Sequence, residues 1–240
     1  MKKTRGILSS AILVGLFAFA SGCGHQPKTI RSANSIALTP ATEHMISIGG
    51  LPLADWPKLA KFANLQHASF SPSDTTDAHL AAFGALRFPA LRQIYLPHAA
   101  QVTDAGVACL SNFPALEGLQ LIGTGITDKS LATFATSFPA LVGINVEECD
   151  RLTVAGFLAL AQSPTIANVS LSLNPLTPAD VERIIQAATN VTWWSIRDRQ
   201  GQLDLGALAR LTDERQIRIS VVDANNHSRS VKNTQPNAAQ

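Results

Sequence analysis

The chain has 240 residues, of which 46% are hydrophobic and 15% are charged, and its formal net charge is +2. Three of the 19 basic residues lie in the first 22 positions, which hold no acidic residue, so the remainder carries 16 basic residues against 17 acidic ones. This balance provides no basic patch of the kind that binds phosphate backbones. We therefore expect no nucleic-acid partner.

Residues 1–22 have the pattern of an export signal. Lys2, Lys3 and Arg5 make a positively charged start, and residues 7–20 form an uncharged, mostly apolar run. That run of 14 residues is too short to span a bilayer comfortably, but its length suits the hydrophobic part of a signal peptide. We therefore interpret residues 1–22 as a signal peptide that is removed from the mature chain.

Small residues at positions 20–22 directly precede Cys23. This Ala-Ser-Gly-Cys sequence resembles the lipobox of bacterial lipoproteins. The resemblance implies that Cys23 is lipidated, becomes the first residue of the mature chain, and is held by its acyl chains in a membrane of the cell envelope. In that family Gly24 at the next position favours the outer membrane. The alternative is an ordinary secretory signal followed by an incidental cysteine.

Two polar segments flank the central part of the chain. Residues 23–40 lack a hydrophobic period, and we interpret them as a tether between the lipid and the fold. Residues 225–240 contain no large apolar side chain except Val231, so we expect a disordered tail. After residue 22, no apolar run is long enough for a membrane-spanning helix.

Residues 41–224 carry an internal repeat of 25 residues. The sequence Phe-Pro-Ala-Leu begins at Phe88, Phe113 and Phe138, and a degenerate copy begins at Ser163. An L-x-x-L-x-L pattern accompanies each copy, and its last apolar residue recurs at Leu96, Leu121, Val146, Leu171 and Ile196. Weaker copies at both ends bring the total to about eight units. A fixed period of this length is typical of a solenoid, in which each unit buries its apolar face against the next.

Each unit predicts one strand followed by one helix. The x-L-x-L stretch alternates at period two, as in a strand with one buried face. About six residues later, Thr and Asp supply oxygens that can cap the N-terminus of a helix. The apolar spacing predicts helices over residues 105–112, 129–137, 154–162, 178–188 and 205–211. Prolines such as Pro114 and Pro139 then end the helix and turn the chain toward the next strand.

These patterns resemble the leucine-rich-repeat family, whose consensus is L-x-x-L-x-L-x-x-N/C-x-L. Cys149 and Asn174 match the Asn/Cys position, and residues 123–131 (GTGITDKSL) are similar to the I-T-D variety of cysteine-containing and bacterial repeats. The resemblance covers residues 41–224. It implies an α/β leucine-rich-repeat solenoid, a right-handed superhelix with parallel strands on its concave face and short helices on its convex face.

The sequence offers little for catalysis or metal binding. Cys109 and Cys149 have no histidine at a spacing that would activate them, so we interpret both as structural thiols, with a disulfide as the alternative. The six histidines form no H-x-x-x-H pair, and there is no C-x-x-C. Residues 147–150 (EECD) form an acidic cluster that we interpret as a solvated loop rather than a cation site. We expect no enzymatic activity, no metal and no cofactor.

The strand residues that alternate away from the core form the candidate binding surface. Tryptophan and arginine are enriched in binding hot spots, so Trp193 and the nearby arginines are of most interest. In this register Trp194 belongs to the core, and a shift by one residue would exchange the two tryptophans. The alternative for Trp193 is that the C-terminal segment covers it as a cap. The candidates on the concave face are Tyr95, Gln120, Asn145, Glu147, Asn168, Trp193, Arg197 and Arg218.

On fold analogy we hypothesise a lipid-anchored recognition scaffold of the cell envelope that binds a protein partner through its concave face. The alternative hypothesis is an envelope or extracellular glycan-binding protein that uses Trp193 and Tyr95, because aromatic rings can stack on sugars. An enzyme of another type would require a deep pocket with converging titratable groups.

Overall fold

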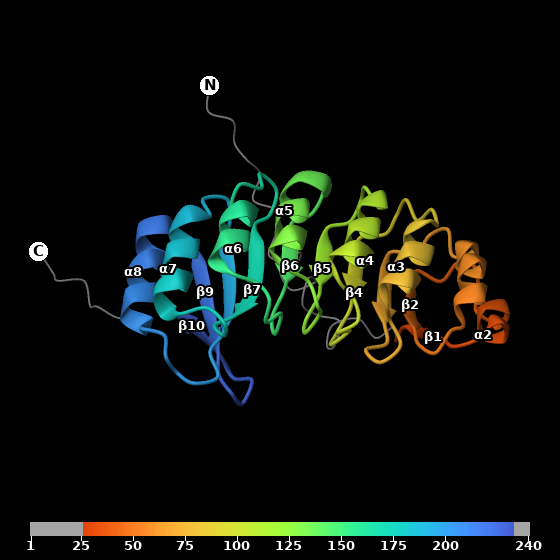
Figure 1. Cartoon of the computed structure of the whole chain (residues 1–240), viewed down its shortest axis with the longest axis horizontal. Coiled ribbons are helices and arrows are strands. Elements are labelled where there is room, and N and C mark those ends of the chain that lie inside the picture. Colours follow the sequence, from red (N-terminus) through yellow and green to blue (C-terminus); the bar gives the residue numbers. More distant parts are fainter. Residues whose placement is uncertain (1–25, 233–240) are drawn as a thin grey trace, which may run out of the picture.

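The computed structural model describes residues 26–232, so the predicted signal peptide and Cys23 lie outside the described residues, as do residues 233–240. Within this range, ten strands form one sheet in chain order, with β1 to β9 parallel and β10 antiparallel (Figure 1). The strands are β1 (Lys28–Ile30), β2 (Met45–Ile48), β3 (His67–Phe70), β4 (Gln93–Tyr95), β5 (Gly118–Gln120), β6 (Gly143–Asn145), β7 (Asn168–Ser172), β8 (Trp193–Arg197), β9 (Arg218–Val222) and β10 (Ser228–Val231).

Helices connect the parallel strands and pack along one face of the sheet (Figure 1). The five predicted helices are present, and each begins within one residue of its predicted start. The α/β repeat solenoid implied by the repeat pattern is therefore confirmed. The helices are α2 (Ala33–Leu38), η1 (Leu53–Lys61), α3 (Asp77–Gly84), α4 (Asp104–Ala108) continued by η2 (Cys109–Asn112), α5 (Asp128–Ser137), α6 (Val154–Leu160), α7 (Pro178–Ala187) and α8 (Leu205–Arg215).

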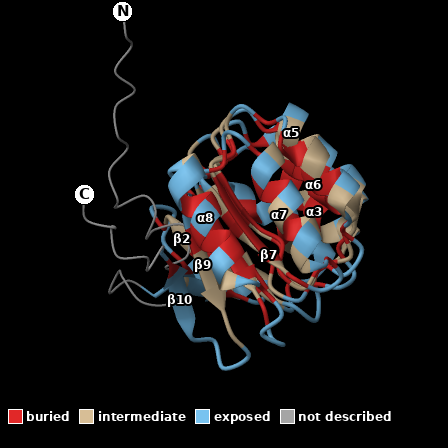
Figure 2. Ribbon diagram, turned by 90° about the vertical axis from the view of Figure 1, so that its left-hand side faces the viewer, coloured by how far each residue is buried: buried red, intermediate tan, exposed pale blue. Residues whose placement is uncertain are grey.

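The core lies between the sheet and the helices (Figure 2). The predicted interior row of Leu96, Leu121, Val146, Leu171 and Ile196 is at most 2% exposed. Trp194 is 1% exposed, so the register that places it in the core and Trp193 on the opposite face is confirmed. Stacking turns the small apolar faces of single coils into one continuous core, which no coil could form alone.

The N-terminal end of the solenoid begins earlier than we expected. Residues 28–38, which we interpreted as part of a tether, form β1 and α2. Ile30 and Ile36 are buried, and Ser32 and Ser35 form a reciprocal capping box at the start of α2. The prediction failed because a terminal coil has a neighbour on one side only, so most of its residues are polar and its hydrophobic period is weak.

The C-terminal end also contains more structure than we expected. Residues 228–231, which we assigned to a disordered tail, form β10 and pair with β9. Val231, the one large apolar residue of that segment, lies opposite Ile219 and is 7% exposed. β10 continues the sheet beside β9. Within residues 26–232, no helix combines the length and apolarity needed to cross a membrane.

A ladder of Thr and Asp side chains connects successive helices on the convex side. Thr103, Thr127 and Thr153 each cap the N-terminus of their own helix, as predicted. Asp128, the first residue of α5, accepts hydrogen bonds from the backbone N–H and the hydroxyl of Thr153 in the next coil, at 2.8 and 2.6 Å. Asp104 bonds Thr127 in the same way. The repeated Asp therefore joins neighbouring coils, a role that the sequence pattern did not predict.

Gly156 lets the Asp128 carboxylate approach the first turn of α6. A Cβ at this position would lie 2.6 Å from Cγ of Asp128. Gly156→Ala is therefore expected to lower the free energy of unfolding by about 2 kcal/mol, although Gly→Ala within a helix normally gains about 1 kcal/mol. Urea unfolding followed by circular dichroism would measure this. In an Asp128→Ala background the same change should cost little, and an equal cost in both backgrounds would contradict the steric explanation.

The ladder also predicts a dependence of stability on pH. Burial, the largest single effect, acts to raise the pKa of the Asp104 carboxyl, but hydrogen bonds from Ser130 and Thr127 outweigh it and hold that pKa below its ordinary value. The ionised carboxylate thus stabilises the fold above the pKa of the unfolded chain, and this stability is lost as the pH falls through the lower pKa of the folded state.

Asp104→Asn should accordingly weaken the loss of stability between neutral pH and about pH 3. Urea unfolding midpoints at a series of pH values would show this. The control is Asp150→Asn, at an exposed carboxyl group that accepts no hydrogen bond from residues 26–232. If Asp104→Asn and the parent chain lose stability identically as the pH falls, the ionised Asp104 carboxylate is not a source of the pH dependence.

Candidate functional site

The concave face is the face of the sheet opposite the helices, and strand register arranges its side chains in two rows. The first row contains Met45, His67, Gln93, Gly118, Gly143, Asn168, Trp193 and Arg218. The second row contains Ser47, Ser69, Tyr95, Gln120, Asn145, Ser170, Ser195 and Ser220. Neighbouring members of a row stand on adjacent strands, about 4.8 Å apart. Apart from Met45 and the aromatic residues Tyr95 and Trp193, the two rows are thus lines of small or polar groups across eight coils.

The middle of the first row has no side chains. Gly118 and Gly143 lie on adjacent strands and pair with each other in register. Gln93 and Asn168 flank them in the same row. The two neighbouring positions lack a Cβ, which leaves room for another group beside the backbone, and both glycines are buried in this structure.

Two uncharged side chains next to the glycines have unused hydrogen-bonding capacity. Asn168 and Ser170 are buried, and neither Oδ1 of Asn168 nor Oγ of Ser170 has a partner among the described residues. An unpaired buried polar atom costs about 1–3 kcal/mol, so a ligand that hydrogen-bonds these oxygens recovers that free energy.

Trp193 and Tyr95 occupy different parts of the concave face. Trp193 is half-buried and stands between Asn168 and the exposed Arg218 in the first row. Tyr95 is half-buried in the second row on β4, four strands from Trp193 on β8. At about 4.8 Å per strand the two aromatic residues are about 19 Å apart, so they cannot form one stacking platform.

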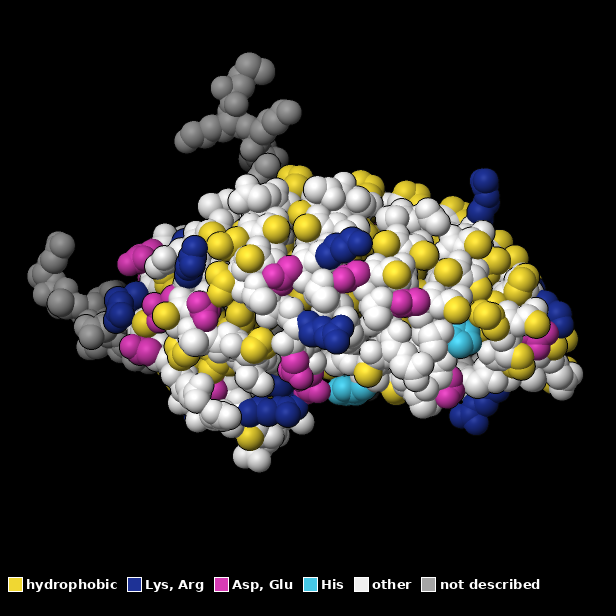
Figure 3. Space-filling view, viewed as in Figure 1, with side chains coloured by type: hydrophobic (Ala, Val, Ile, Leu, Met, Phe, Trp, Pro, Cys, Tyr) yellow, Lys and Arg dark blue, Asp and Glu magenta, His cyan; other side chains and the backbone are white. Residues whose placement is uncertain are grey.

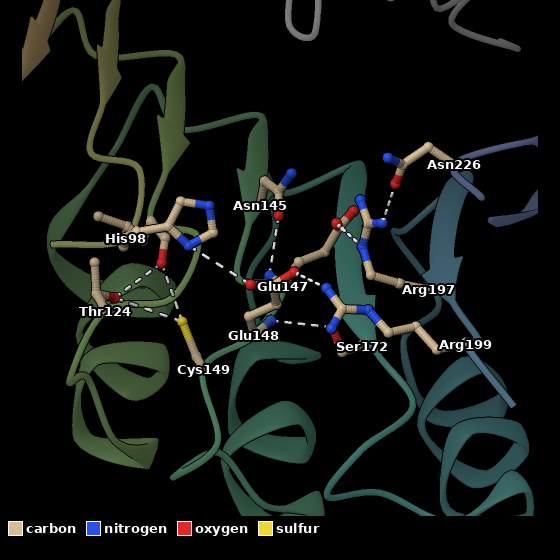
Figure 4. A network of polar contacts seen from close by, with 11 residues as sticks. His98, Thr124, Asn145, Glu147, Glu148, Cys149, Ser172, Arg197, Arg199 and Asn226 are labelled. Carbon is tan, nitrogen blue, oxygen red and sulfur yellow. Dashed lines mark hydrogen bonds and ion pairs between the residues drawn. The ribbon is translucent and has the colours of Figure 1, made fainter. Parts of the chain in front are cut away.

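Beyond the strand ends, the structure brings together two of the predicted site residues, Glu147 and Arg197 (Figure 4). Nε of Arg197 donates to Oε2 of Glu147 at 2.6 Å, and Nη1 of Arg197 donates to Oδ1 of Asn226 at 2.6 Å. Oδ1 of Asn145 accepts the backbone N–H of Glu147 at 2.9 Å. This network holds Glu147 at its carboxylate and at its backbone N–H, and through Arg197 it connects Glu147 to the turn before β10.

The Glu147–Arg197 ion pair is largely shielded from solvent. The Glu147 side chain is 6% exposed and the Arg197 side chain is 19% exposed. Burial raises the pKa of Glu147, and the Arg197 guanidinium opposes that rise. The Arg197 guanidinium thus favours the ionised form of the Glu147 carboxyl, which burial disfavours.

A second pair links Glu148 to residues on both sides of it (Figure 4). Glu148 forms an ion pair with Arg199, and its Oε2 lies 3.5 Å from Nδ1 of His98, which is two coils away. His98, Gly123 and Glu148 hold the same turn position in successive coils, with positive φ angles of 50°, 63° and 60°. Gly123 has no side chain, so His98 and Glu148 can meet across it.

Glu147 and Glu148 of the acidic cluster at residues 147–150 therefore form ion pairs with arginines, which differs from the solvated loop that we expected, whereas Asp150 is exposed. An open depression of about 420 Å³ lies beside it, with Glu148, Asn174 and Arg199 among its lining residues. Within residues 26–232, no three His, Cys, Asp or Glu side chains converge as they would around a metal ion.

Both cysteines of the described range are free thiols, as we interpreted them. Cys149 is buried, and its Sγ donates to the carbonyl oxygen of Leu121 at 3.0 Å. Burial raises the pKa of the Cys149 thiol, which keeps it in the unreactive protonated form. Its role is to satisfy loop backbone, as the Asn/Cys position of the repeat implies.

Sequence reasoning missed the partners of the predicted site residues. Arg199 and His98 were not among the candidates, because the period placed them in turns rather than on strands, and Asn226 was not, because we assigned residues 225–240 to a disordered tail. The spacing of 50 residues, two coils, between Glu147 and Arg197 was a usable signal, since such positions lie on the same side of the solenoid.

Comparison with known proteins supplies no family for this chain. No protein-family model matches the sequence, and the search of curated proteins finds no relative. Among solved structures, Rad7 in the yeast Rad7–Elc1 complex is 14% identical and covers 72% of this chain with a TM-score of 0.45. An internalin (inlF) from Listeria monocytogenes is 16% identical and covers 75% with a TM-score of 0.38.

This chain spans 56% and 54% of those two structures, about half the length of each. The assignment of the fold accordingly rests on the register and core of this chain itself.

Proposed function

We propose that this chain is a non-catalytic recognition scaffold that binds a protein partner through its concave face. The observation that carries the proposal is the pair of in-register rows of mostly small and polar side chains across eight coils. Such a surface suits an extended or convex partner, because each coil adds contacts of the same kind in a fixed direction. Gly118 and Gly143 carry no side chain at its centre, and Asn168 and Ser170 provide buried oxygens without a hydrogen-bond partner among the described residues.

The scaffold is, in this proposal, anchored in the bacterial cell envelope, with the outer membrane favoured. Support comes from the export-signal pattern of residues 1–22 and the lipobox resemblance at Cys23, which lie outside the described residues. Metabolic labelling with a palmitate analogue and mass spectrometry of the mature N-terminus test it. Cys23→Ser should abolish labelling and release the chain from the membrane fraction, and an unlabelled parent chain would refute the anchor.

Photocrosslinking in intact cells tests the binding surface. The photo-reactive residue is best placed at Gln120 in the second row, because the Asn145 side chain already holds the backbone of Glu147. The matched control carries the same residue at Lys129, which is exposed on the convex helix α5. We expect a discrete crosslinked protein from position 120 and none from position 129. Equal products from both positions would contradict the assignment of the concave face.

Glycan binding is the second candidate function, favoured by the half-buried Trp193 beside the exposed Arg218. Because Tyr95 is about 19 Å away, a single sugar unit would contact Trp193 alone, and a longer chain would be needed to reach both. Glycan-array binding that is lost on Trp193→Ala would support this function. An array without signal for the folded parent chain would refute it.

A further inference from the structure

The length of chain between the proposed anchor and the fold limits how far the solenoid can stand from the membrane. β1 begins at Lys28, five residues after Cys23. A fully extended chain spans at most about 3.6 Å per residue, so Lys28 lies within about 18 Å of the acylated cysteine. An 18-residue tether would have allowed more than three times that distance. The early start of the fold therefore places the end of the solenoid that contains β1 next to any membrane that holds Cys23.

That end, which we define as residues 26–62, exposes apolar side chains. Within residues 26–232, the exposed large hydrophobic residues are Leu38, at 77%, and Leu53, at 43%. Leu38 is the last residue of α2 and Leu53 is the first residue of η1, two elements that pack against each other. Figure 3 shows hydrophobic side chains gathered at this end of the molecule, with Lys and Arg side chains at its rim.

The same end carries a positive charge that the rest of the fold lacks. Residues 26–62 contain four basic and two acidic residues, whereas residues 63–232 contain twelve basic and fifteen acidic ones. Of the two acidic side chains, Glu43 is buried and Asp55 is paired with Lys58 at 2.6 Å. Lys28 and Arg31 are exposed. Lys61 donates to the carbonyl oxygens of Ile36 and Ala37 and so closes the end of α2.

We propose that residues 26–62 form a face that docks onto an anionic lipid surface, with Leu38 and Leu53 at the interface and the surrounding cations against the headgroups. The proposal rests on the proposed lipid anchor at Cys23. Exposed apolar groups together with cations are the combination that binds peripheral proteins to membranes, at about fivefold in binding for each cation near an anionic surface. Docking at this end directs the coils away from the membrane and leaves the concave face open to a partner.

Lysine footprinting on the whole mature protein tests the docking. The acylated chain is reconstituted into vesicles of phosphatidylcholine alone, or of phosphatidylcholine mixed with phosphatidylglycerol, at low salt. Acetylation rates are then measured by mass spectrometry. We expect Lys28 and Lys58 to be acetylated at least fivefold more slowly on the anionic vesicles. Lys129, exposed on α5, should react at the same rate on both.

Two charge reversals separate docking from other effects. Arg31→Glu should restore fast acetylation of Lys58 on anionic vesicles. Arg229→Glu, the same change at an exposed residue of β10 at the other end of the sheet, should not. Equal rates on both vesicle types, with Cys23 shown to be acylated by mass, would overturn the docking and leave the anchor intact. A mature chain without an acyl group would overturn both.

Discussion

Replacing Glu147 with alanine is expected to lower the free energy of unfolding by about 3 kcal/mol, because it leaves the guanidinium of Arg197 largely buried without its carboxylate. The change also leaves Asn226 as the remaining described partner of Arg197. Urea unfolding monitored by tryptophan fluorescence is a suitable measurement, since Trp193 and Trp194 lie on the strand that carries Arg197.

The neighbouring residue provides the matched control. Glu148 also pairs with an arginine two coils away, but the Glu148 side chain is 30% exposed and that of Arg199 is 60% exposed. Water screens and replaces such a pair, so Glu148→Ala should cost less than about 1 kcal/mol. A double change, Glu147→Leu with Arg197→Met, should recover most of the loss. Equal costs for Glu147→Ala and Glu148→Ala would show that burial does not determine the strength of these pairs.

The repeat period and the interior row could be predicted from the sequence because both are local and redundant. Each coil repeats the same alternation of apolar residues, so an irregular coil such as the one around Ser163 does not disturb the register of its neighbours. The helix starts were predictable for a similar reason, since a Thr that caps a helix acts within one turn of its own position. These signals are independent of how distant coils face each other.

The ends and the polar contacts could not be predicted in this way. β1 and β10 each have a partner on one side only, so their residues are mostly polar, and the buried Ile30 and Val231 are too few to give a period. The bond between Asp128 and Thr153 and the ion pair between Glu147 and Arg197 join different coils. Their formation depends on side-chain direction and coil curvature, which a period of 25 residues does not specify.

The candidate surface was predictable in its membership but not in its internal geometry. Alternation along the strands places Asn145 and Trp193 away from the core, and the structure does the same. The sequence did not show that Tyr95 and Trp193 stand in different rows four strands apart, or that Asn145 uses its side chain to hold Glu147. That Gly118 and Gly143 lie side by side on adjacent strands follows from the strand register, which the structure supplies.

Gly143→Arg is expected to abolish capture of the partner at Gln120 without unfolding the protein. Gly143 pairs with Gly118 on one side and Asn168 on the other, so an arginine there places a long charged side chain across the centre of the first row. Its φ angle is not positive, and replacing a glycine within a strand removes an entropic cost. Because Gly143 is buried, the urea unfolding midpoint of the variant is measured alongside to show that it folds.

The crosslinking yield from position 120 should fall at least tenfold, because steric exclusion and an uncompensated charge both oppose the bound state. Ala132→Arg provides the matched control, since it introduces the same side chain at an exposed position of α5 on the convex side. That variant should retain the parental yield. A partner seated between Gly118 and Asn168 cannot accommodate an arginine at position 143. If the folded Gly143→Arg protein captures its partner as well as the Ala132→Arg protein does, the centre of the concave face is therefore excluded as the binding surface.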